Sequence, residues 1–319
     1  MDMLSERLGF VGVTTEESAI NRLFPLWADQ LGIDATIEGY DLPLDASASA
    51  CRDFVSSIKA DRRLRGALVT SHKTALFEHA ANAFDRLDDN ARLLREISCI
   101  SRDGNDFVGS AKDLVTAHLA FDQMVGAGHW ARNSDAEVLI LGAGGAGVAI
   151  AAMLDGKSPG PSRITVTDTA PARIAEVQRI AGVLGSTRLA SMVVASTEQS
   201  DAFVLSLPDG SLIVNATGMG KDLAGAPISQ AATFPNDGLV WELNYRGELD
   251  FLRLAARQAE KRRLRLFDGW IYFLFGWAAV ICEVWGLELT PPLFDELEAI
   301  AASLGHLPIV PEAEVRADL

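Results

Sequence analysis

The residues of this chain that are best suited to do chemistry form a glycine-rich turn at 142–147, with the sequence GAGGAG. The apolar run Val138–Leu141 precedes the turn and an alanine-rich helical pattern follows it, which is the context that a dinucleotide-binding turn requires. Glycines let the backbone approach a pyrophosphate, and the N–H groups at the helix start hold its charge. We therefore predict a dinucleotide cofactor bound by Gly142, Ala143, Gly144, Gly145, Ala146 and Gly147.

The next predicted strand, 164–167, is followed by Asp168. An acidic side chain at this point, about 20 residues beyond the glycines, hydrogen-bonds the adenosine ribose of a dinucleotide. A carboxylate there also repels the 2′-phosphate that distinguishes NADP from NAD, so the sequence favours NAD over NADP. Because Asp168 opens the run Asp-Thr-Ala-Pro-Ala, it is also a candidate to cap the following helix, and the two roles are compatible.

Composition and charge limit the classes of function. The length of 319 residues suits one large or two modest domains, and the net charge of −15 disfavours a nucleic-acid or anionic-membrane partner. The three cysteines lack CxxC or metal-ligand spacing and the N-terminus does not read as a signal peptide, which favours a cytoplasmic protein without a metal. The apolar stretch 270–285 is short for a membrane span and contains Glu283, so we expect a buried helix. A homodimer remains a possible form of the protein.

Strands and helices alternate along the chain, which is typical of an α/β fold. We predict strands at 9–13, 36–42, 66–70, 138–141, 164–167, 189–195, 212–216 and 239–244. We predict helices at 20–31, 47–59, 75–83, 269–285 and 291–304, and a polar tail at 308–319. This order indicates an N-terminal α/β substrate domain (1–114), a Rossmann-type doubly wound nucleotide-binding domain (115–267) and C-terminal helices (268–319) that return to the first domain. The reaction would take place in the cleft between the domains.

Six segments in this order carry a family resemblance. They are LGIDA at 31–35, GALVTSHK at 66–73, GSAKD at 109–113, the glycine turn at 142–147, NATGMG at 215–220, and Asp268-Gly269 with the apolar helix that ends in Trp285-Gly286. Together they resemble the shikimate and quinate dehydrogenases, from about residue 9 to residue 286. The resemblance implies hydride transfer between a nicotinamide cofactor and a cyclic secondary alcohol or ketone.

The resemblance implies catalytic roles for two residues. Lys73 falls on the family's catalytic lysine, and Asp113 on the aspartate that pairs with it. A desolvated lysine whose pKa is lowered toward neutrality can exchange a proton with a hydroxyl while hydride moves. A surface ion pair without a catalytic role is the alternative. We expect His72, the neighbouring acid–base candidate, to lie on the opposite side of an extended segment, packed or hydrogen-bonded.

Further residues are predicted around the two ligands. The small-residue turn after the strand at 212–216 would line the nicotinamide ribose, and the cofactor residues there are Asn215, Ala216, Thr217, Gly218, Met219 and, from the closing segment, Gly269. The candidate substrate-binding residues are Thr14, Thr15, Ser18, Thr70, Ser98, Tyr245, Tyr272 and Gly276. Gly276 occupies the position of the family's substrate-binding glutamine, and Ser98 that of an asparagine.

The departures from the family affect the substrate. The family's S-x-S-P element is absent from 12–20, where Glu16 and Glu17 stand instead, and REISC at 95–99 replaces "G-A-V-N-T". Ala111 and Lys112 replace the first two residues of "N-T-D". Since buried polar groups without partners cost about 1–3 kcal/mol each, losing this many substrate contacts argues against shikimate itself. Quinate, a neutral cyclitol or a cyclic alcohol with an apolar flank fits at least as well.

Two other classes of function stay open. One is an NAD-binding sensor whose catalysis has decayed, although the presence of both Lys73 and Asp113 favours an enzyme. The other is an enzyme of the methylene-tetrahydrofolate dehydrogenase type, which shares a similar two-domain plan. A relative of glutamyl-tRNA reductase is disfavoured, because no cysteine has a supporting base and the acidic charge opposes tRNA.

Overall fold

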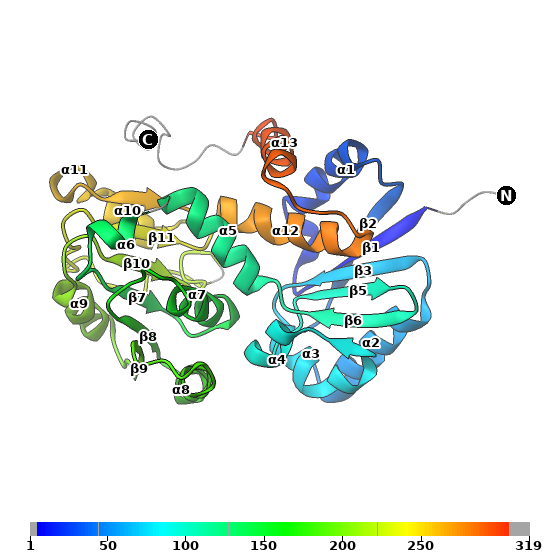
Figure 1. Cartoon of the computed structure of the whole chain (residues 1–319), viewed down its shortest axis with the longest axis horizontal. Helices are drawn as coiled ribbons and strands as arrows, with labels where there is room; N and C mark the ends of the chain where they lie inside the picture. The colour runs from blue at the N-terminus through cyan, green and yellow to red at the C-terminus, as the bar shows by residue number, and fades with distance from the viewer. Residues whose placement is uncertain (1–4, 44, 127, 222, 306–319) are drawn as a thin grey trace. The chain divides into compact units, whose positions relative to one another are not determined.

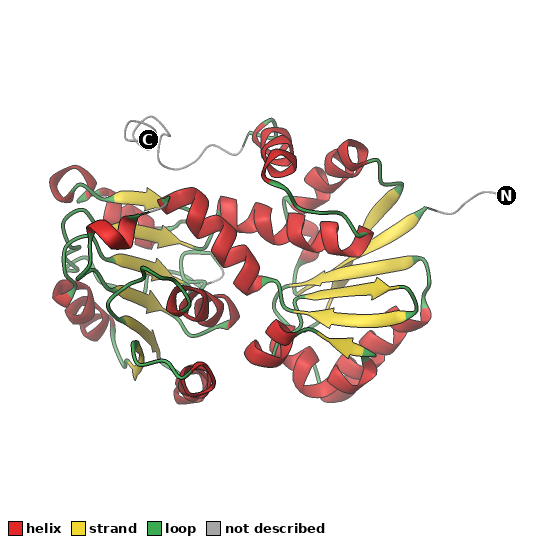
Figure 2. Cartoon of the chain, in the orientation of Figure 1, coloured by secondary structure: helices red, strands yellow, loops and turns green. Residues whose placement is uncertain are grey.

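The computed structural model describes residues 5–43, 45–126, 128–221 and 223–305, so the predicted tail at 308–319 lies outside the described residues. The described chain forms two compact units. The first comprises the residues up to Asp113 and those from Leu274 onward, and the second comprises Leu114–Phe273. Each unit has one six-stranded sheet with helices against it (Figures 1 and 2). The predicted α/β class is confirmed.

The first unit begins with a strand and alternates from there. Its elements up to Asp113 are β1 (Glu6–Gly12), η1 (Thr15–Glu17), α1 (Ile20–Leu31), β2 (Ala35–Asp41), α2 (Ala48–Ala60), β3 (Leu64–Val69), α3 (Lys73–Ala80), η2 (Ala81–Ala83), β4 (Arg86–Leu87), α4 (Asp89–Leu94), β5 (Cys99–Asp103) and β6 (Asp106–Ser110). It is completed by α12 (Trp270–Trp285) from Leu274 onward and by α13 (Pro291–Ala302).

The sheet of the first unit has the strand order β2-β1-β3-β5-β6-β4. Strand β5 is antiparallel to both of its neighbours, β3 and β6, and the other pairs are parallel. Consequently β1, β2, β3 and β6 all end at the edge of the sheet where β5 begins. We refer to this as the carboxyl edge, and the loops that follow these four strands meet there.

Helices cover both faces of this sheet. On one face, α2 and α3 bury a core that includes Val55, Leu76 and Ile100. On the other face, the Trp277 ring of α12 lies edge-on to Phe10 of β1, with ring centroids 4.9 Å apart. The α1 helix joins this layer, because the indole Nε1 of Trp27 donates to the Leu297 carbonyl of α13 at 2.9 Å. These contacts pack α12 on β1 and join α1 to α13.

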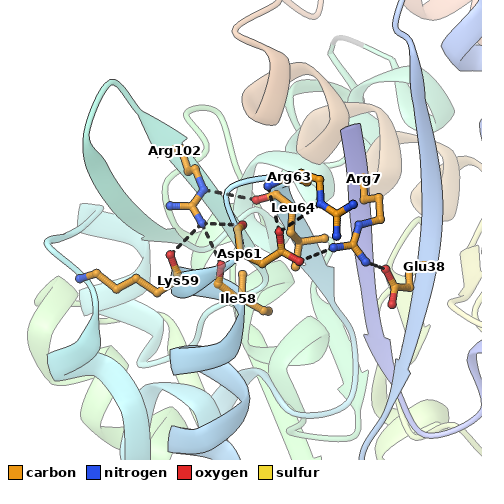
Figure 3. A network of polar contacts seen from close by, with 8 residues as sticks. All are labelled: Arg7, Glu38, Ile58, Lys59, Asp61, Arg63, Leu64 and Arg102. Carbon is orange, nitrogen blue, oxygen red and sulfur yellow. Dashed lines mark hydrogen bonds and ion pairs between the residues drawn. The ribbon is translucent and has the colours of Figure 1, made fainter. Parts of the chain in front are cut away.

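The opposite edge of the sheet is fastened by a polar network (Figure 3). The Arg102 guanidinium on β5 donates to the carbonyls of Ile58, Lys59, Asp61 and Leu64, at 2.8 to 3.3 Å. It thereby satisfies carbonyls at the end of α2 that have no partner within the helix. Arg7 of β1 forms ion pairs with Glu38 and Asp61, which tie β1 to β2 and to the turn before β3.

The second unit begins after Asp113 with the remainder of α5. Its elements are α5 (Asp113–Val125), α6 (His129–Arg132), β7 (Val138–Leu141), α7 (Gly145–Asp155), β8 (Ile164–Asp168), α8 (Pro171–Leu184), β9 (Leu189–Val193), α9 (Thr197–Ser206), β10 (Leu212–Asn215), β11 (Leu239–Glu242), α10 (Asp250–Ala256), α11 (Ala259–Arg262), β12 (Arg265–Phe267) and the first turn of α12. The unit therefore includes the first turn of α12, a helix that is predicted to belong to the C-terminal segment 268–319.

The sheet of the second unit is parallel throughout, in the order β12-β11-β10-β7-β8-β9. This is the doubly wound order, in which the chain starts in the middle and builds outward in both directions. The direction of winding reverses between β7 and β10, where Gly142 follows one strand and Ala216 follows the other. Dinucleotides bind at such a switch point, so the predicted glycine turn lies where the fold class requires it.

The observed boundaries agree with most of the predicted elements. Helix α1 has its predicted bounds, and it ends because Gly32 adopts a left-handed conformation with φ 66°. The helix predicted at 75–83 differs at both ends, since α3 begins at Lys73 and ends at Ala80, and residues 81–83 form the short 3-10 helix η2. The hairpin of β5 and β6 and the short strand β12 are not among the predicted strands. Within the described part of the chain, no helix is both long enough and apolar enough to cross a membrane.

Candidate functional site

The first candidate site lies at the carboxyl edge of the first sheet. Lys73 begins α3, shortly after β3 ends, and Asp113 begins α5, shortly after β6 ends. Because both strands end at this edge, side chains that are far apart in sequence meet. The Lys73 Nζ donates to Asp113 Oδ1 at 2.7 Å and to Oδ2 at 2.5 Å. The structure thus pairs the two residues that the family resemblance places in catalysis.

The Lys73–Asp113 pair is largely withdrawn from water but still reachable. The exposed fraction of the side chain is 19% for Lys73 and 8% for Asp113. Asp113 is the first residue of α5, where the free N–H groups and the helix dipole stabilise a carboxylate. The Lys73 main chain is held as well, because its carbonyl accepts from the N–H of Ile97 at 3.0 Å. The pair is therefore positioned by three separate elements.

The pKa of Lys73 corrects one prediction. Burial lowers the pKa of Lys73, but the negative charges of Asp113 and Glu96 and the hydrogen bond to Asp113 raise it by more. The net pKa lies above the ordinary lysine value, so the expectation of a pKa lowered toward neutrality is wrong for this structure. The arrangement therefore favours the ammonium form of Lys73.

A third ionisable group near this pair is Glu96, which was not among the predicted site residues. Its side chain is 1% exposed, and burial followed by the charge of Asp113 raises its pKa to about 8. It follows Arg95, which ends α4 in the left-handed conformation with φ 52°. The signal in the sequence was a glutamate in place of the alanine of the family's "G-A-V-N-T" element.

The predicted substrate hydroxyls also lie at the carboxyl edge, in different environments. Thr14 and Thr70 are exposed, and the Thr70 Oγ1 donates to the Val11 carbonyl at 2.9 Å. Thr15 is 3% exposed and its hydroxyl faces Gly39, so its side chain packs against β2. Ser18 is half-buried just after η1. These positions leave Thr14, Ser18 and Thr70 as the accessible hydroxyls.

Ser98 and Lys112 each have a partner within the first unit. The Ser98 hydroxyl is buried and accepts from the N–H of Lys112 at 2.7 Å. The Lys112 ammonium forms an ion pair with Glu283 of α12. Glu283 also accepts from Ser101 at 3.0 Å and Ser110 at 2.6 Å. Both residues that replace family contacts are thus tied to the protein, and a role of Ser98 in substrate binding stays a prediction.

His72 is buried and its Nε2 lies 2.9 Å from the carbonyl oxygen of Leu42. The prediction of a packed, hydrogen-bonded histidine is confirmed. Its stated reason is wrong, because Lys73 begins a helix and the two residues do not share an extended segment.

The second candidate site is the glycine turn of the second unit. Gly142 has φ 106°, and a Cβ there would lie 2.8 Å from the Ala216 carbonyl. A Cβ at Gly147 would lie 2.2 Å from the Gly142 oxygen, so only glycine lets the helix approach the turn. Around Gly144 no atom lies within 4 Å of an added Cβ, and Gly144, Gly145 and Ala146 are half-buried at the start of α7. This open helix start fits a pyrophosphate.

Asp168 ends β8 beside this turn. Its Oδ2 accepts from the N–H of Ala143 at 2.8 Å and its Oδ1 accepts from the N–H of Ala170 at 2.8 Å. The carboxylate thus holds the glycine turn and the turn before α8. The prediction that Asp168 caps the following helix is wrong, because Ala170 is the N-cap of α8 and has no side-chain cap, and ribose binding by Asp168 stays a prediction. Arg173 lies next to it, with NH1 3.5 Å from Oδ2, and its side chain is 62% exposed.

A pocket of about 310 Å³ opens at this end of the second sheet. Its lining includes Gly142, Asp168, Arg173, Thr217 and Met219. The pocket brings together the glycine turn, the acidic strand end and the turn after β10, which the sequence analysis assigns separately to the cofactor.

The turn after β10 is held by a buried amide network. Asn215 is fully buried; its Oδ1 accepts from the Thr217 hydroxyl at 2.7 Å and its Nδ2 donates to Glu242 at 2.6 Å. Glu242 also accepts from Asn244, whose Nδ2 reaches the Met219 carbonyl at 3.0 Å. Asn215 thus shapes the turn that includes Ala216 and Gly218, which are half-buried, and cofactor binding by this turn stays a prediction.

The remaining candidates lie on or near α12. A Cβ at Gly269 would lie 2.0 Å from the Leu243 oxygen, so this glycine allows close packing against the strand β11 segment. The Tyr245 ring packs on Phe273, with centroids 4.4 Å apart, and the Tyr272 ring lies 5.9 Å from Trp241. Gly276 is half-buried within the helix. These contacts are structural, and substrate binding by Tyr245, Tyr272 and Gly276 stays a prediction.

Known proteins share both the sequence pattern and the fold. The shikimate dehydrogenase (NADP(+)) of Methylobacterium radiotolerans is 29% identical over 311 residues, which cover 94% of this chain and 99% of that protein. The shikimate dehydrogenase (NADP(+)) of Streptococcus gordonii is 30% identical over 177 residues, 54% of this chain and 58% of that protein. The chain resembles the shikimate and quinate dehydrogenases. No family model matches it.

Solved structures of this kind share the fold. The quinate dehydrogenase of Corynebacterium glutamicum in complex with NAD has a TM-score of 0.72 and 17% identity, over 94% of this chain and 99% of that one. The 5-ketofructose reductase of a Gluconobacter species has a TM-score of 0.66 and 19% identity, over 93% and 99%. The two-domain Rossmann-type fold predicted from the sequence is therefore confirmed.

Proposed function

We propose that this protein is a nicotinamide-dependent oxidoreductase that interconverts a secondary alcohol and a ketone. The observation that carries the proposal is the two-point contact between Lys73 and Asp113. Such a pair, buried for the most part but not fully, can hold a substrate hydroxyl and exchange its proton. The resemblance to shikimate and quinate dehydrogenases supports the same chemistry.

The charge state of the pair sets how each direction would proceed. Because the pKa of Lys73 is raised, its ammonium is the form present at neutral pH and can donate a proton to the oxygen of a ketone. In the oxidative direction Lys73 must first lose that proton, after which it can take the proton of the alcohol. Asp113 stays beside it, orienting the Nζ and balancing its charge. The bound nicotinamide ring would supply or accept the hydride.

We propose NAD as the cofactor, with NADP as the competing candidate. The open start of α7 and the pocket beside it suit a dinucleotide of either kind. The Asp168 carboxylate would accept hydrogen bonds from a ribose and repel a 2′-phosphate, which supports NAD. Arg173 beside it could pair with that phosphate, and the two named shikimate dehydrogenases are NADP(+) enzymes, whereas the named quinate dehydrogenase is in complex with NAD. The preference therefore depends on whether the Asp168 carboxylate or the Arg173 guanidinium acts more strongly on the 2′-position of the ribose.

We propose a polyol or cyclic alcohol with little negative charge as the substrate. Glu16 and Glu17 are exposed near the carboxyl edge and would disfavour an anion there. Lys112, which precedes Asp113 and could otherwise bind a carboxylate, is already paired with Glu283. The fold itself is compatible with more than one substrate, since a 5-ketofructose reductase has it.

The test is reduced-cofactor formation, followed by absorbance, with shikimate, quinate, inositols and cyclohexanols, each with NAD and NADP. For an alcohol that is turned over, Lys73→Met should lower kcat by about 10²- to 10⁴-fold, as expected for loss of a proton-transfer group. Cofactor affinity measured by calorimetry should be unchanged. The control is Lys59→Met, which removes a Lys–Asp pair with Asp85 elsewhere in the same unit. A Lys73→Met enzyme as fast as wild type would exclude the mechanism, and cofactor binding without any turnover would favour a sensor.

A further inference from the structure

Glu96 is a buried carboxyl group without an assigned role. Its side chain is 1% exposed, and among the described residues no group hydrogen-bonds its Oε1. Burying a carboxylate without partners is costly, so such groups are rare unless they are neutral or used. The family's "G-A-V-N-T" element has an alanine at this position, so the fold does not require a carboxyl group here.

The backbone places Glu96 at the carboxyl edge together with the catalytic candidates. Helix α4 ends at Leu94, and Arg95 reverses the chain in the left-handed conformation, where most residues are strained. Ile97 follows Glu96, and its N–H donates to the Lys73 carbonyl at 3.0 Å. Strand β5 then starts at Cys99. The left-handed turn thus sets Glu96 just before β5, which lies between β3 and β6 in the sheet. Lys73 and Asp113 begin the helices that follow β3 and β6.

The charged groups that act on Glu96 come from three elements. They are Asp113 at the start of α5, Lys73 at the start of α3, and Asp88 at the N-cap of α4. Asp113 and Asp88 disfavour a negative charge on Glu96, and Lys73 favours one. In the reverse direction, the charge of Glu96 favours the ammonium form of Lys73. Ionisation of Glu96 and of Lys73 are therefore linked.

We propose that Glu96 is a positioning residue that controls how tightly the Lys73–Asp113 pair holds its proton. When Glu96 is a neutral acid, the lysine is held only by Asp113. When Glu96 loses its proton, a second negative charge strengthens the hold of Lys73 on its own proton. The use of this linkage in turnover rests on the proposed function, whereas the linkage itself does not.

The titration of Glu96 can be measured without any substrate. Glutamate labelled with ¹³C at the side-chain carboxyl gives one resonance per residue, and the one missing from Glu96→Gln belongs to Glu96. We expect its midpoint near the pKa of about 8, compared with an ordinary value of 4.5. A midpoint near 4.5 would overturn the proposal whatever the protein catalyses.

Stability gives a second readout that does not depend on activity. Because folding raises the pKa of Glu96, its neutral form favours the folded state; this contribution is complete below pH 4.5 and is lost as the pH rises to about 8. The urea midpoint of wild type should therefore fall relative to that of Glu96→Gln across this range. Glu78→Gln, an exposed change of the same charge on α3, is the control and should follow wild type. Parallel curves for Glu96→Gln and wild type would contradict the assignment.

The third readout is the pH profile of alcohol oxidation with a substrate found above. Removing the charge of Glu96 should move the alkaline rise in kcat to lower pH by at least about half a unit, roughly a threefold change in proton affinity. A purely structural role would change the rate without moving this limb. The linkage itself is read from the Glu96 midpoint in Lys73→Met, which should rise because the positive charge that favours ionised Glu96 is removed. A midpoint that does not move in Lys73→Met would overturn the proposal even if no substrate is found. If it moves but the alkaline limb does not, the linkage exists and its use in catalysis is refuted.

Discussion

Replacing Asp168 by asparagine should shift the cofactor preference toward NADP. The substitution keeps the size of the side chain and removes its charge. In the structure the carboxylate faces the pocket beside the glycine turn and lies 3.5 Å from the Arg173 guanidinium. Without it, a 2′-phosphate would no longer meet a negative charge, and Arg173 would be free to pair with the phosphate.

The size of the shift follows from the charges. A phosphate and a carboxylate about 5 Å apart in a nearly aqueous setting repel each other by about 1–2 kcal/mol. This corresponds to roughly a 5- to 30-fold gain in the ratio of NADP to NAD affinity. Affinity for both cofactors should also fall, because an asparagine amide cannot accept from both Ala143 and Ala170 as the carboxylate does. That shared loss is about 1–3 kcal/mol and cancels in the ratio.

Calorimetric titration of each cofactor measures this ratio without a substrate. Arg173→Ala is the matched variant and should move the ratio the other way, since it removes the cation and leaves the carboxylate. An unchanged ratio in Asp168→Asn, with both affinities reduced, would mean that Asp168 only holds the turn. The argument for NAD would then fail.

The remaining predictions concern the cofactor turn and the fold. Gly144→Ala should fold normally, since φ is −74° and an added Cβ meets nothing within 4 Å. It should nevertheless weaken dinucleotide binding by about tenfold or more, because the methyl group would crowd the phosphate. Calorimetry tests this against Gly182→Ala, which is equally open but lies in α8, and equal affinities of the two variants would exclude a phosphate at Gly144. Arg102→Ala should destabilise the protein by about 2–4 kcal/mol, because four carbonyls lose their donor. Urea denaturation measures this loss, and Arg86→Ala, an exposed pair with Asp103, should cost less than about 1 kcal/mol. Equal losses in the two variants would contradict this reading of the Arg102 network.

The parts of the fold that could be predicted from sequence are those with a local cause. The bounds of α1 follow from its apolar spacing and from Gly32, and the glycine turn is recognisable from the strand and helix around it. The pairing of Lys73 with Asp113 could be predicted because both residues fall on motifs of a family whose topology is fixed. Each of these signals is contained in a short stretch of chain.

The parts that could not be predicted depend on contacts between distant segments. The pKa of Lys73 is raised by the charge of Asp113 and then by that of Glu96, and the sequence around Lys73 does not show that Glu96 comes near it. The second role of Asp168 is a hydrogen bond to Ala143 across two strands. Lys112 stands in a substrate motif, yet it pairs with Glu283 from the far end of the chain. Sequence patterns identify such groups, whereas packing determines their charge and partners.

The contact between the two turns of the second unit has a consequence for how the protein can evolve. Gly142 and Ala216 approach so closely that an added Cβ would meet the neighbouring carbonyl at 2.8 Å. A change in the turn proposed to hold the phosphates therefore displaces the turn proposed for the nicotinamide end, and the reverse. Substitutions in the two turns should be strongly non-additive, as for any residues in contact. A lineage adapting one end of the cofactor site would have to accept mutations at the other in a restricted order.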